Sequence, residues 1–259
     1  AASDVYKRQM QHLTILTGAS RGMGLAMADQ LLAPDALLLC ISRQTNAALA
    51  DQAQRVGATL LQWPLDLSDG ARAAARLREW LVQQNPAALA SATLINNAGV
   101  IPALVPLSES DPVALAQALR VGLEAPMQLC AAFLGATHAW TMPRKVLNIS
   151  SGLGRRAMAS QAAYCAAKAG MDHFTRCLAL DEAQQPHGAK VCSLAPGVID
   201  TEMQQQLRSS DASRFPDQGS FASLHAQGQL TSPADAARRV LRYLARADFG
   251  EQPVADVRQ

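Results

Sequence analysis

The sequence contains few cysteines and histidines, and they are not grouped. Five cysteines and five histidines are dispersed over 259 residues, without a C-x-x-C pair. This odd, scattered set of cysteines argues against a disulfide framework and against a zinc site. We therefore expect a protein of the reducing cytoplasm that binds no metal.

Long hydrophobic runs and an excess of one charge are also missing. No apolar run approaches the ~20 residues that a membrane-spanning helix requires. The formal net charge is only +2, and basic pairs such as Arg155–Arg156 and Arg238–Arg239 do not extend into a basic run. The sequence therefore favours neither nucleic acid nor a membrane as a partner.

The remaining composition is that of a folded globular protein. Hydrophobic residues make up 49% of the chain and charged residues 17%. From residue 10 onward we find no linker, composition break or internal repeat, so we expect one domain over residues 10–259. Residues 1–9 are polar and precede Met10, and we expect them to be a non-native or disordered extension.

Short apolar runs alternate with longer amphipathic segments. The apolar runs predict strands at 13–17, 36–41, 59–63, 92–96, 145–150 and 190–194, with a short last strand at 253–257. The amphipathic segments predict helices at 22–33, 47–56, 70–84, 112–139, 161–184 and 233–247. This alternation predicts an α/β fold with parallel βαβ units, which is a doubly wound, Rossmann-type sheet with helices on both faces.

A glycine-rich turn follows the first expected strand. Gly18, Gly22 and Gly24 lack a Cβ atom, which lets the backbone approach a dinucleotide pyrophosphate. The helix that begins here adds unpaired N–H groups and a partial positive charge. The turn predicts a nucleotide site; the alternative is that the glycines only pack the helix onto the strand.

The end of the second strand distinguishes NAD from NADP. An acidic residue at this position would bind the ribose hydroxyls of NAD. This chain has Ser42 and Arg43 instead, with Arg21 in the glycine turn. Because guanidinium groups bind phosphate oxygens in pairs, we predict NADP(H) as the cofactor. The alternative is that both arginines are solvated surface residues.

Further cofactor contacts are expected at the ends of the third and fourth strands. Asp66 is placed to accept a hydrogen bond from the adenine amino group, although it could instead cap a helix beside Ser68. Ala98 and Gly99 would let the ribose lie against the fourth strand. The expected nucleotide site comprises Gly18, Ser20, Arg21, Gly22, Met23, Gly24, Ser42, Arg43, Asp66, Leu67, Asn97, Ala98 and Gly99.

Ser151, Tyr164 and Lys168 form the expected catalytic set. A phenol has a pKa near ~10 in water, and Lys168, one helical turn away, would favour its phenolate. Ser151 would bind the substrate oxygen as negative charge develops on it. The set predicts hydride transfer from a nicotinamide to a carbonyl carbon, with proton transfer from Tyr164 to the oxygen. Tyr164 and Lys168 are also expected to contact the cofactor, and Lys168 would hold the ribose hydroxyls and relay the replacement proton.

A Y-x-x-x-K pattern alone occurs often by chance. Tyr164 could be an amphipathic residue on a packed helix, and Lys168 could be a surface cation. The serine thirteen residues before the tyrosine, the strand that precedes it and the glycine turn upstream favour the catalytic interpretation.

Together these motifs resemble the short-chain dehydrogenase/reductase family. The pattern T-G-x-x-x-G-x-G lies at 17–24, N-N-A-G at 96–99, Y-x-x-x-K at 164–168 and P-G at 196–197. The resemblance runs from Leu13 nearly to the C-terminus and implies a seven-stranded sheet. It also implies that the nicotinamide is bordered by Pro196, Gly197, Val198 and Thr201.

The family usually forms dimers or tetramers through its two long central helices, so we expect a homodimer or homotetramer. Small residues on the Tyr164 helix would permit such packing, although an intramolecular contact would explain them equally well; they are Ala162, Ala163, Ala166, Ala167 and Gly170.

One position departs from the family pattern. The family commonly has an asparagine in the long helix before the fifth strand, where it supports a water-mediated proton relay. The matching residue here is Gly122, which supplies no amide and costs about 1 kcal/mol relative to alanine in a helix. Because a water could fill the gap, we expect activity, at a lower rate.

Within the family, the chain resembles sepiapterin reductases and bacterial benzil or diketone reductases, in the segments 163–168, 195–205 and 249–256. Asp256 falls where an aspartate of sepiapterin reductase anchors the pterin, although it could also be a solvated charge on the tail. The expected substrate-binding residues are Ser151, Gly197, Met203 and Asp256.

A polar stretch at about 201–232 is expected to form a mobile lid over the substrate. Its apolar residues would line the substrate site or simply pack the lid onto the domain; they are Met203, Leu207, Phe215 and Phe221.

The sequence therefore predicts an NADPH-dependent reductase of a small ketone, diketone or pterin side-chain carbonyl. One alternative is an NADP(H)-binding regulator or sensor with little turnover, which only Gly122 supports. Another is an NAD-dependent alcohol dehydrogenase.

Overall fold

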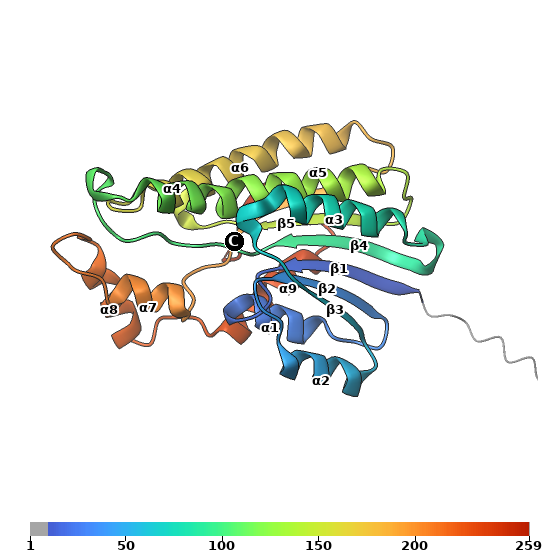
Figure 1. Ribbon diagram of the computed structural model, residues 1–259, viewed down its shortest axis with the longest axis horizontal. Helices are drawn as coiled ribbons and strands as arrows, with labels where there is room; N and C mark the ends of the chain where they lie inside the picture. The colour runs from blue at the N-terminus through green and yellow to red at the C-terminus, as the bar shows by residue number, and fades with distance from the viewer. Residues whose placement is uncertain (1–9, 259) are drawn as a thin grey trace, which may run out of the picture.

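The computed structural model of the protein describes residues 10–258 (Figure 1). The predicted extension at residues 1–9 lies outside the described residues. Within them, seven strands form one parallel sheet in the order β3-β2-β1-β4-β5-β6-β7. The strands are β1 (Gln11–Thr17), β2 (Ala36–Ser42), β3 (Thr59–Pro64), β4 (Leu89–Asn96), β5 (Arg144–Ile149), β6 (Lys190–Ala195) and β7 (Val254–Asp256). The predicted doubly wound fold is confirmed.

Helices cover both faces of this sheet (Figure 1). One face carries α3 (Gly70–Val82), α4 (Pro112–Leu119), α5 (Ala125–Thr137) and α6 (Ala162–Ala183). The other carries α1 (Gly22–Leu31), α2 (Ala47–Val56) and α9 (Pro233–Ala245). Parallel strands must be joined by a connection that crosses from one end of the sheet to the other, and helices such as α1 and α2 lie in these connections.

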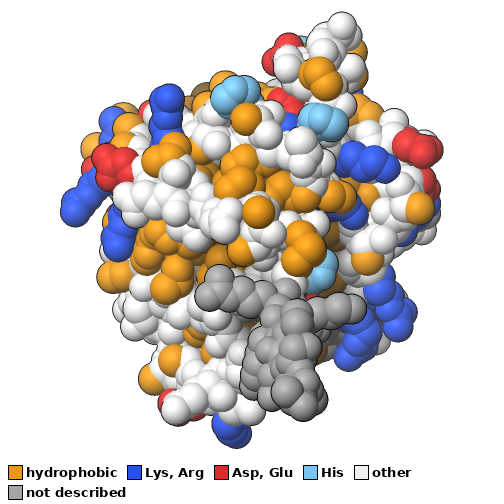
Figure 2. Space-filling view, turned by 90° about the vertical axis from the view of Figure 1, so that its right-hand side faces the viewer, with side chains coloured by type: hydrophobic (Ala, Val, Ile, Leu, Met, Phe, Trp, Pro, Cys, Tyr) orange, Lys and Arg blue, Asp and Glu red, His pale blue; other side chains and the backbone are white. Residues whose placement is uncertain are grey.

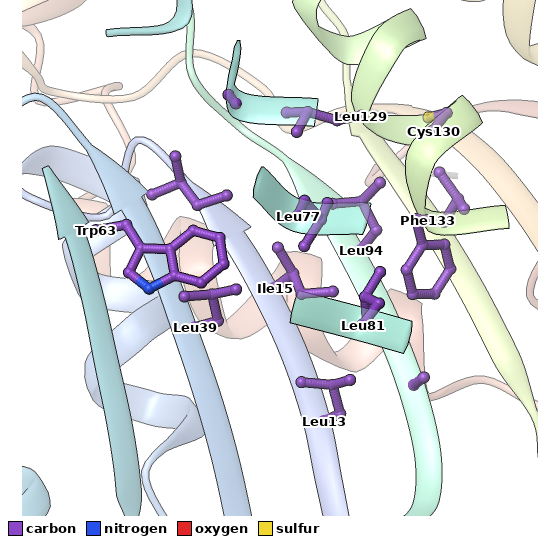
Figure 3. Close-up of a cluster of buried hydrophobic side chains, with 14 of the residues drawn as sticks. Leu13, Ile15, Leu39, Trp63, Leu77, Leu81, Leu94, Leu129, Cys130 and Phe133 are labelled. Atoms are coloured by element: carbon purple, nitrogen blue, oxygen red, sulfur yellow. The ribbon is translucent and has the colours of Figure 1, made fainter. Parts of the chain in front are cut away.

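The hydrophobic core lies on both faces because successive strand residues point in opposite directions. Ile15 of β1 packs towards Leu77 and Leu81 of α3, together with Phe133 of α5 (Figure 3). The next residue, Leu16, belongs to a second cluster on the opposite face, with residues of α1 and α9. All seven residues of β2 are buried, as expected for a central strand covered on both sides.

The predicted helix at 112–139 is interrupted in the structure. Between α4 and α5, the chain forms a π-helical segment at Arg120–Glu124. Pro126 has no backbone N–H and cannot donate to the carbonyl of Gly122 four residues earlier, so the regular α-helical bonding is disrupted here. The amphipathic pattern was read correctly as helical, but the change in hydrogen bonding was not predicted.

The predicted lid contains two further helices, α7 (Glu202–Arg208) and α8 (Gln218–Ala226). Figure 1 shows them apart from the two helical layers, near the carboxyl ends of the strands. The two ends of this segment are joined by a β-bridge between Ile199 and Thr231. The aromatic rings of Phe215 and Phe221 stack with their centroids 5.8 Å apart. The mobility of this segment stays a prediction.

Among residues 10–258, no helix combines the length and the hydrophobicity needed to cross a membrane. Figure 2 views the molecule from the end where the strands begin. On this face, lysine and arginine side chains lie in separate groups between hydrophobic and neutral ones.

Candidate active site

A cavity of about 570 Å³ lies at the carboxyl ends of the strands. The sheet order reverses here, between β1 and β4, which is where ligands bind in doubly wound folds. Every predicted site residue except Asp256 lines this cavity. The structure thus brings the glycine turn, the residues after β2 and the Ser–Tyr–Lys set into one place.

The glycine turn requires residues without a side chain. Gly18 has a φ of +69°, and a Cβ atom there would lie 2.9 Å from the Cα of Ala98. A Cβ on Gly24 would collide with the carbonyl oxygen of Gly18. These glycines therefore serve the packing of α1 on the turn, and the same lack of side chains keeps the backbone open to the cavity.

Thr17 and Asn97 connect the ends of β1 and β4. The Oγ1 of Thr17 accepts hydrogen bonds from the backbone N of Asn97 (2.9 Å) and of Ala98 (3.0 Å). The side-chain amide of Asn97 donates to the backbone oxygens of Thr17 and Gly18. Asn97 thus supports the turn through its side chain, and Thr17 was missed by the sequence analysis although it begins the family motif.

Ser42, the last residue of β2, and Arg43, which follows it, differ in their bonding. The hydroxyl of Ser42 is buried and accepts a hydrogen bond from the backbone N of Ala19 (2.8 Å). Arg43 lines the cavity and makes no ion pair or side-chain hydrogen bond within the described chain. Arg21 is paired with Glu202 of α7. Of Arg21 and Arg43, the two arginines predicted to bind the 2′-phosphate, only Arg43 has a guanidinium group without a partner in residues 10–258.

Asp66 caps a short 3-10 helix at Leu67–Asp69, which is the alternative role that the sequence analysis considered for it. Its carboxylate accepts from the backbone N of Ser68 (2.8 Å), and this hydrogen bond lowers the pKa of Asp66. Asp66 also lines the cavity. Capping keeps the carboxylate ionised at the edge of the cavity.

Ser151, Tyr164 and Lys168 converge from two elements. Ser151 follows β5 and accepts from the backbone N of Leu153 (3.2 Å). Tyr164 and Lys168 lie one turn apart on α6, with the Lys168 Nζ atom 5.7 Å from the centre of the tyrosine ring. The same Nζ donates to the backbone oxygen of Ile149 at the end of β5 (2.7 Å). This bond fixes the ammonium group beside the phenol.

The acid–base properties of the pair differ from the sequence prediction in one respect. Burial raises the pKa of Tyr164, and a hydrogen bond with Ser151 opposes this only in part. Burial also lowers the pKa of Lys168 to about 8, against the opposing charge of Asp172. The chain alone therefore favours the neutral phenol, because burial outweighs the hydrogen bond with Ser151. A neutral phenol is the form that can donate a proton.

The low pKa of Lys168 leads to a pH prediction. Lys168 is charged below pH 8 and loses its proton as the pH rises through about 8. We expect kcat/KM for carbonyl reduction to be level below this pH and to fall about tenfold per unit above it. A pH–rate profile with saturating nucleotide measures this break. A profile that stays level up to the ordinary pKa of lysine, 10.5, would contradict it.

Asp172 is a buried carboxylate that the sequence analysis missed. It is 2% exposed and accepts hydrogen bonds from the hydroxyls of Ser150 (2.6 Å) and Ser193 (2.7 Å). Arg155 is its ion-pair partner, at 3.2 Å. These contacts connect α6 to the ends of β5 and β6. The only feature of the sequence that could have indicated this role is the position of Asp172, one helical turn after Lys168.

Gly122 is buried in the π-helical segment and faces α6. A Cβ atom on Gly122 would lie 3.1 Å from the Cβ of Ala167, the residue before Lys168. The glycine allows a close approach of the two helices, and any longer side chain at this position would have to displace Ala167. On α6, Gly170 packs in the same way against Leu123. The small residues Ala167 and Gly170 thus serve intramolecular contacts.

We expect the change Gly122→Asn to destabilise the protein rather than to restore a relay. The longer side chain would have to displace Ala167, and overpacking of this kind costs about 1–3 kcal/mol. Urea denaturation measures the loss. Gly135→Asn is the matched control, because a Cβ on Gly135 meets no atom within 4 Å. Equal stability of the two variants would contradict this packing role.

The structure gives Asp256 a partner within the chain. Its carboxylate accepts from the guanidinium group of Arg258 (2.7 and 2.6 Å), which lowers the pKa of Asp256. Asp256 itself does not line the cavity, whereas Arg258 does. Sequence reasoning had not singled out Arg258.

The lid contributes an apolar wall. Met203, Leu207 and Phe221 line the cavity, together with Val198, which precedes the lid. Phe215 does not; it is fully buried in a cluster with Leu104 and Leu207. Leu207 and Phe221 thus both line the cavity and pack within the lid, whereas Met203 lines the cavity and Phe215 only packs; their contact with a substrate stays a prediction.

With this geometry established, comparison with known proteins identifies the family. The sequence profile of the short chain dehydrogenases matches residues 12–212. The chain belongs to the short-chain dehydrogenase family.

As a short-chain dehydrogenase, the protein is an oxidoreductase, and its relatives include carbonyl reductases. It is 32% identical over 240 residues to a benzil reductase of Bacillus cereus that forms (S)-benzoin, covering 93% of this chain and 96% of the relative. It is 31% identical over 246 residues to the sepiapterin reductase of Meriones unguiculatus, covering 91% and 92%. A metagenomic short-chain oxidoreductase solved in complex with NADP has a TM-score of 0.70 at 26% identity, covering 96% of each chain.

Proposed function

We propose that this short-chain dehydrogenase is an NADPH-dependent carbonyl reductase in which Tyr164 donates the proton. The observation that carries the proposal is the convergence of Ser151, Tyr164 and Lys168 in the cavity that the glycine turn also lines. A bound nicotinamide would supply the hydride.

The described residues fit a phosphorylated dinucleotide. Gly18 and Gly24 cannot accept a side chain, which suits a backbone that contacts a pyrophosphate. Arg43, without a partner in residues 10–258, suits a 2′-phosphate. The NADP complex of a solved relative supports the same choice.

The residues of the chain would divide the reaction as follows. The hydroxyls of Ser151 and Tyr164 would bind the carbonyl oxygen and stabilise the charge that develops on it. Tyr164, whose raised pKa keeps it protonated, would donate its proton as that charge forms. Lys168, held by the oxygen of Ile149, would stabilise the phenolate that remains and assist its reprotonation.

The walls of the cavity favour a small apolar or aromatic carbonyl compound. Val198, Met203, Leu207 and Phe221 form an apolar side next to the reacting groups. Benzil and sepiapterin, named for two relatives, are aromatic or heteroaromatic compounds. We therefore place a ketone, a diketone or a pterin side-chain carbonyl among the expected substrates.

A panel of benzil, 1-phenyl-1,2-propanedione and sepiapterin with NADPH tests the proposal. Turnover is measured as loss of NADPH absorbance, in steady state and in a single turnover with excess enzyme. No oxidation of bound NADPH by any of these compounds would refute the reductase and favour a sensor. Binding of NADH as tight as that of NADPH would instead favour an NAD-dependent enzyme.

A further inference from the structure

Gln161 has a buried amide without a partner. It directly precedes α6 and is 1% exposed. Among residues 10–258, neither its Oε1 nor its Nε2 atom has a hydrogen-bond partner. Gln161 also lines the cavity that contains Tyr164 and Lys168.

Such an amide is costly, because buried polar groups are normally paired. Here both ends of the amide are unpaired, whereas other buried amides, such as that of Asn148, are bonded to neighbouring side chains. An apolar side chain would fill the same space without this cost. The amide therefore has the properties of a group that binds a polar ligand.

The position of Gln161 indicates which ligand atom it can reach. Gln161 is the residue before α6 and precedes Tyr164 by three positions, and both line the same cavity. A substrate whose carbonyl oxygen meets the Tyr164 hydroxyl therefore lies in the cavity that Gln161 also lines.

We propose that Gln161 selects 1,2-dicarbonyl compounds by donating a hydrogen bond from Nε2 to the oxygen next to the reacting carbonyl. This inference rests on the proposed function and narrows its substrate class. A simple ketone leaves the amide unpaired, and sites built to bond a polar group reject analogues that lack it. A vicinal diketone satisfies both the Ser151–Tyr164 pair and the amide.

The test compares two substrates that differ only in the second oxygen, 1-phenyl-1,2-propanedione and propiophenone, with NADPH. The variant Gln161→Met keeps the length of the side chain and removes its hydrogen bonds. We expect kcat/KM to fall about tenfold for the diketone and less than about twofold for propiophenone. For each ketone, kcat/KM of the variant is divided by that of the wild type, so the intrinsic reactivity of the ketone cancels.

Gln54→Met, on the exposed surface of α2, is the matched control. Equal losses for both ketones, or no loss for either, would overturn the role of Gln161 while leaving the reductase intact. If the wild type turned over neither ketone but reduced sepiapterin, this inference would be overturned and the proposed function would stand; no turnover of any of these compounds would overturn both.

Product inhibition of the wild type provides a readout that does not depend on a variant. We expect 1-hydroxy-1-phenylacetone to inhibit about tenfold more strongly than 1-phenylpropan-1-ol, which lacks the second oxygen. Equal inhibition by the two alcohols would overturn the proposal.

Discussion

Replacing Tyr164 with phenylalanine is expected to lower kcat/KM for carbonyl reduction by about 10³-fold. The phenol is the proton donor, and its raised pKa keeps it protonated at neutral pH. Phenylalanine keeps the ring and removes only the hydroxyl. Steady-state rates with a diketone and NADPH measure the effect, and NADPH affinity, measured by fluorescence titration, is expected to change little.

Tyr243→Phe is the matched control for this change. Tyr243 lies on α9, and its ring packs against Phe249 in a T-shaped arrangement with centroids 6.2 Å apart. It does not line the cavity, so its loss of a hydroxyl is expected to leave the rate unchanged. Rates within about twofold for Tyr164→Phe and wild type would refute the proton-donor role, since general acids contribute far more than this.

The change Arg43→Ala is expected to weaken NADPH binding by about 30-fold and to leave NADH binding unchanged. The guanidinium group has no partner in the described chain, so its hydrogen bonds would be made only with the 2′-phosphate. Hydrogen bonds to charged groups contribute about 1.5–3 kcal/mol, which corresponds to roughly ten- to a hundredfold in affinity. Titration of both nucleotides measures the ratio of dissociation constants.

Arg55→Ala controls for the loss of one positive charge. Arg55 lies on the exposed side of α2 and bonds only to Gln52. It is expected to change neither affinity by more than about twofold, because exposed charges are strongly screened. If Arg43→Ala weakened both nucleotides equally, Arg43 would bind a part of the cofactor that NADH and NADPH share.

Much of the fold was readable from the sequence because local pattern and tertiary structure agree. Helix α2 occupies the predicted range, 47–56, because Asn46 caps its start and Gly57 ends it in a left-handed conformation. Strand β4 begins at Leu89 rather than at 92, since its first residues are paired with β1 although they lack an apolar pattern. Whether such residues belong to a strand depends on the neighbouring strand with which they pair, and not on their own hydrophobic pattern.

The site was predicted where chemistry follows from residue type and spacing. The glycine turn and the Ser–Tyr–Lys set lie in one cavity as expected. Features that depend on long-range packing were not predicted: the π-helical segment, the pairing of Asp256 with Arg258, and the burial that raises the pKa of Tyr164. Gln161 was passed over because nothing in the sequence shows that its amide is buried.

The contact between Gly122 and Ala167 makes these two positions interdependent during divergence. An asparagine at 122 would press on Ala167, and a glycine at 167 would relieve that contact. Because the two residues touch, we expect the effects of substitutions at the two positions on stability not to be additive. A pair of substitutions tested in a double-mutant cycle should therefore show a stabilising interaction that neither single change reveals.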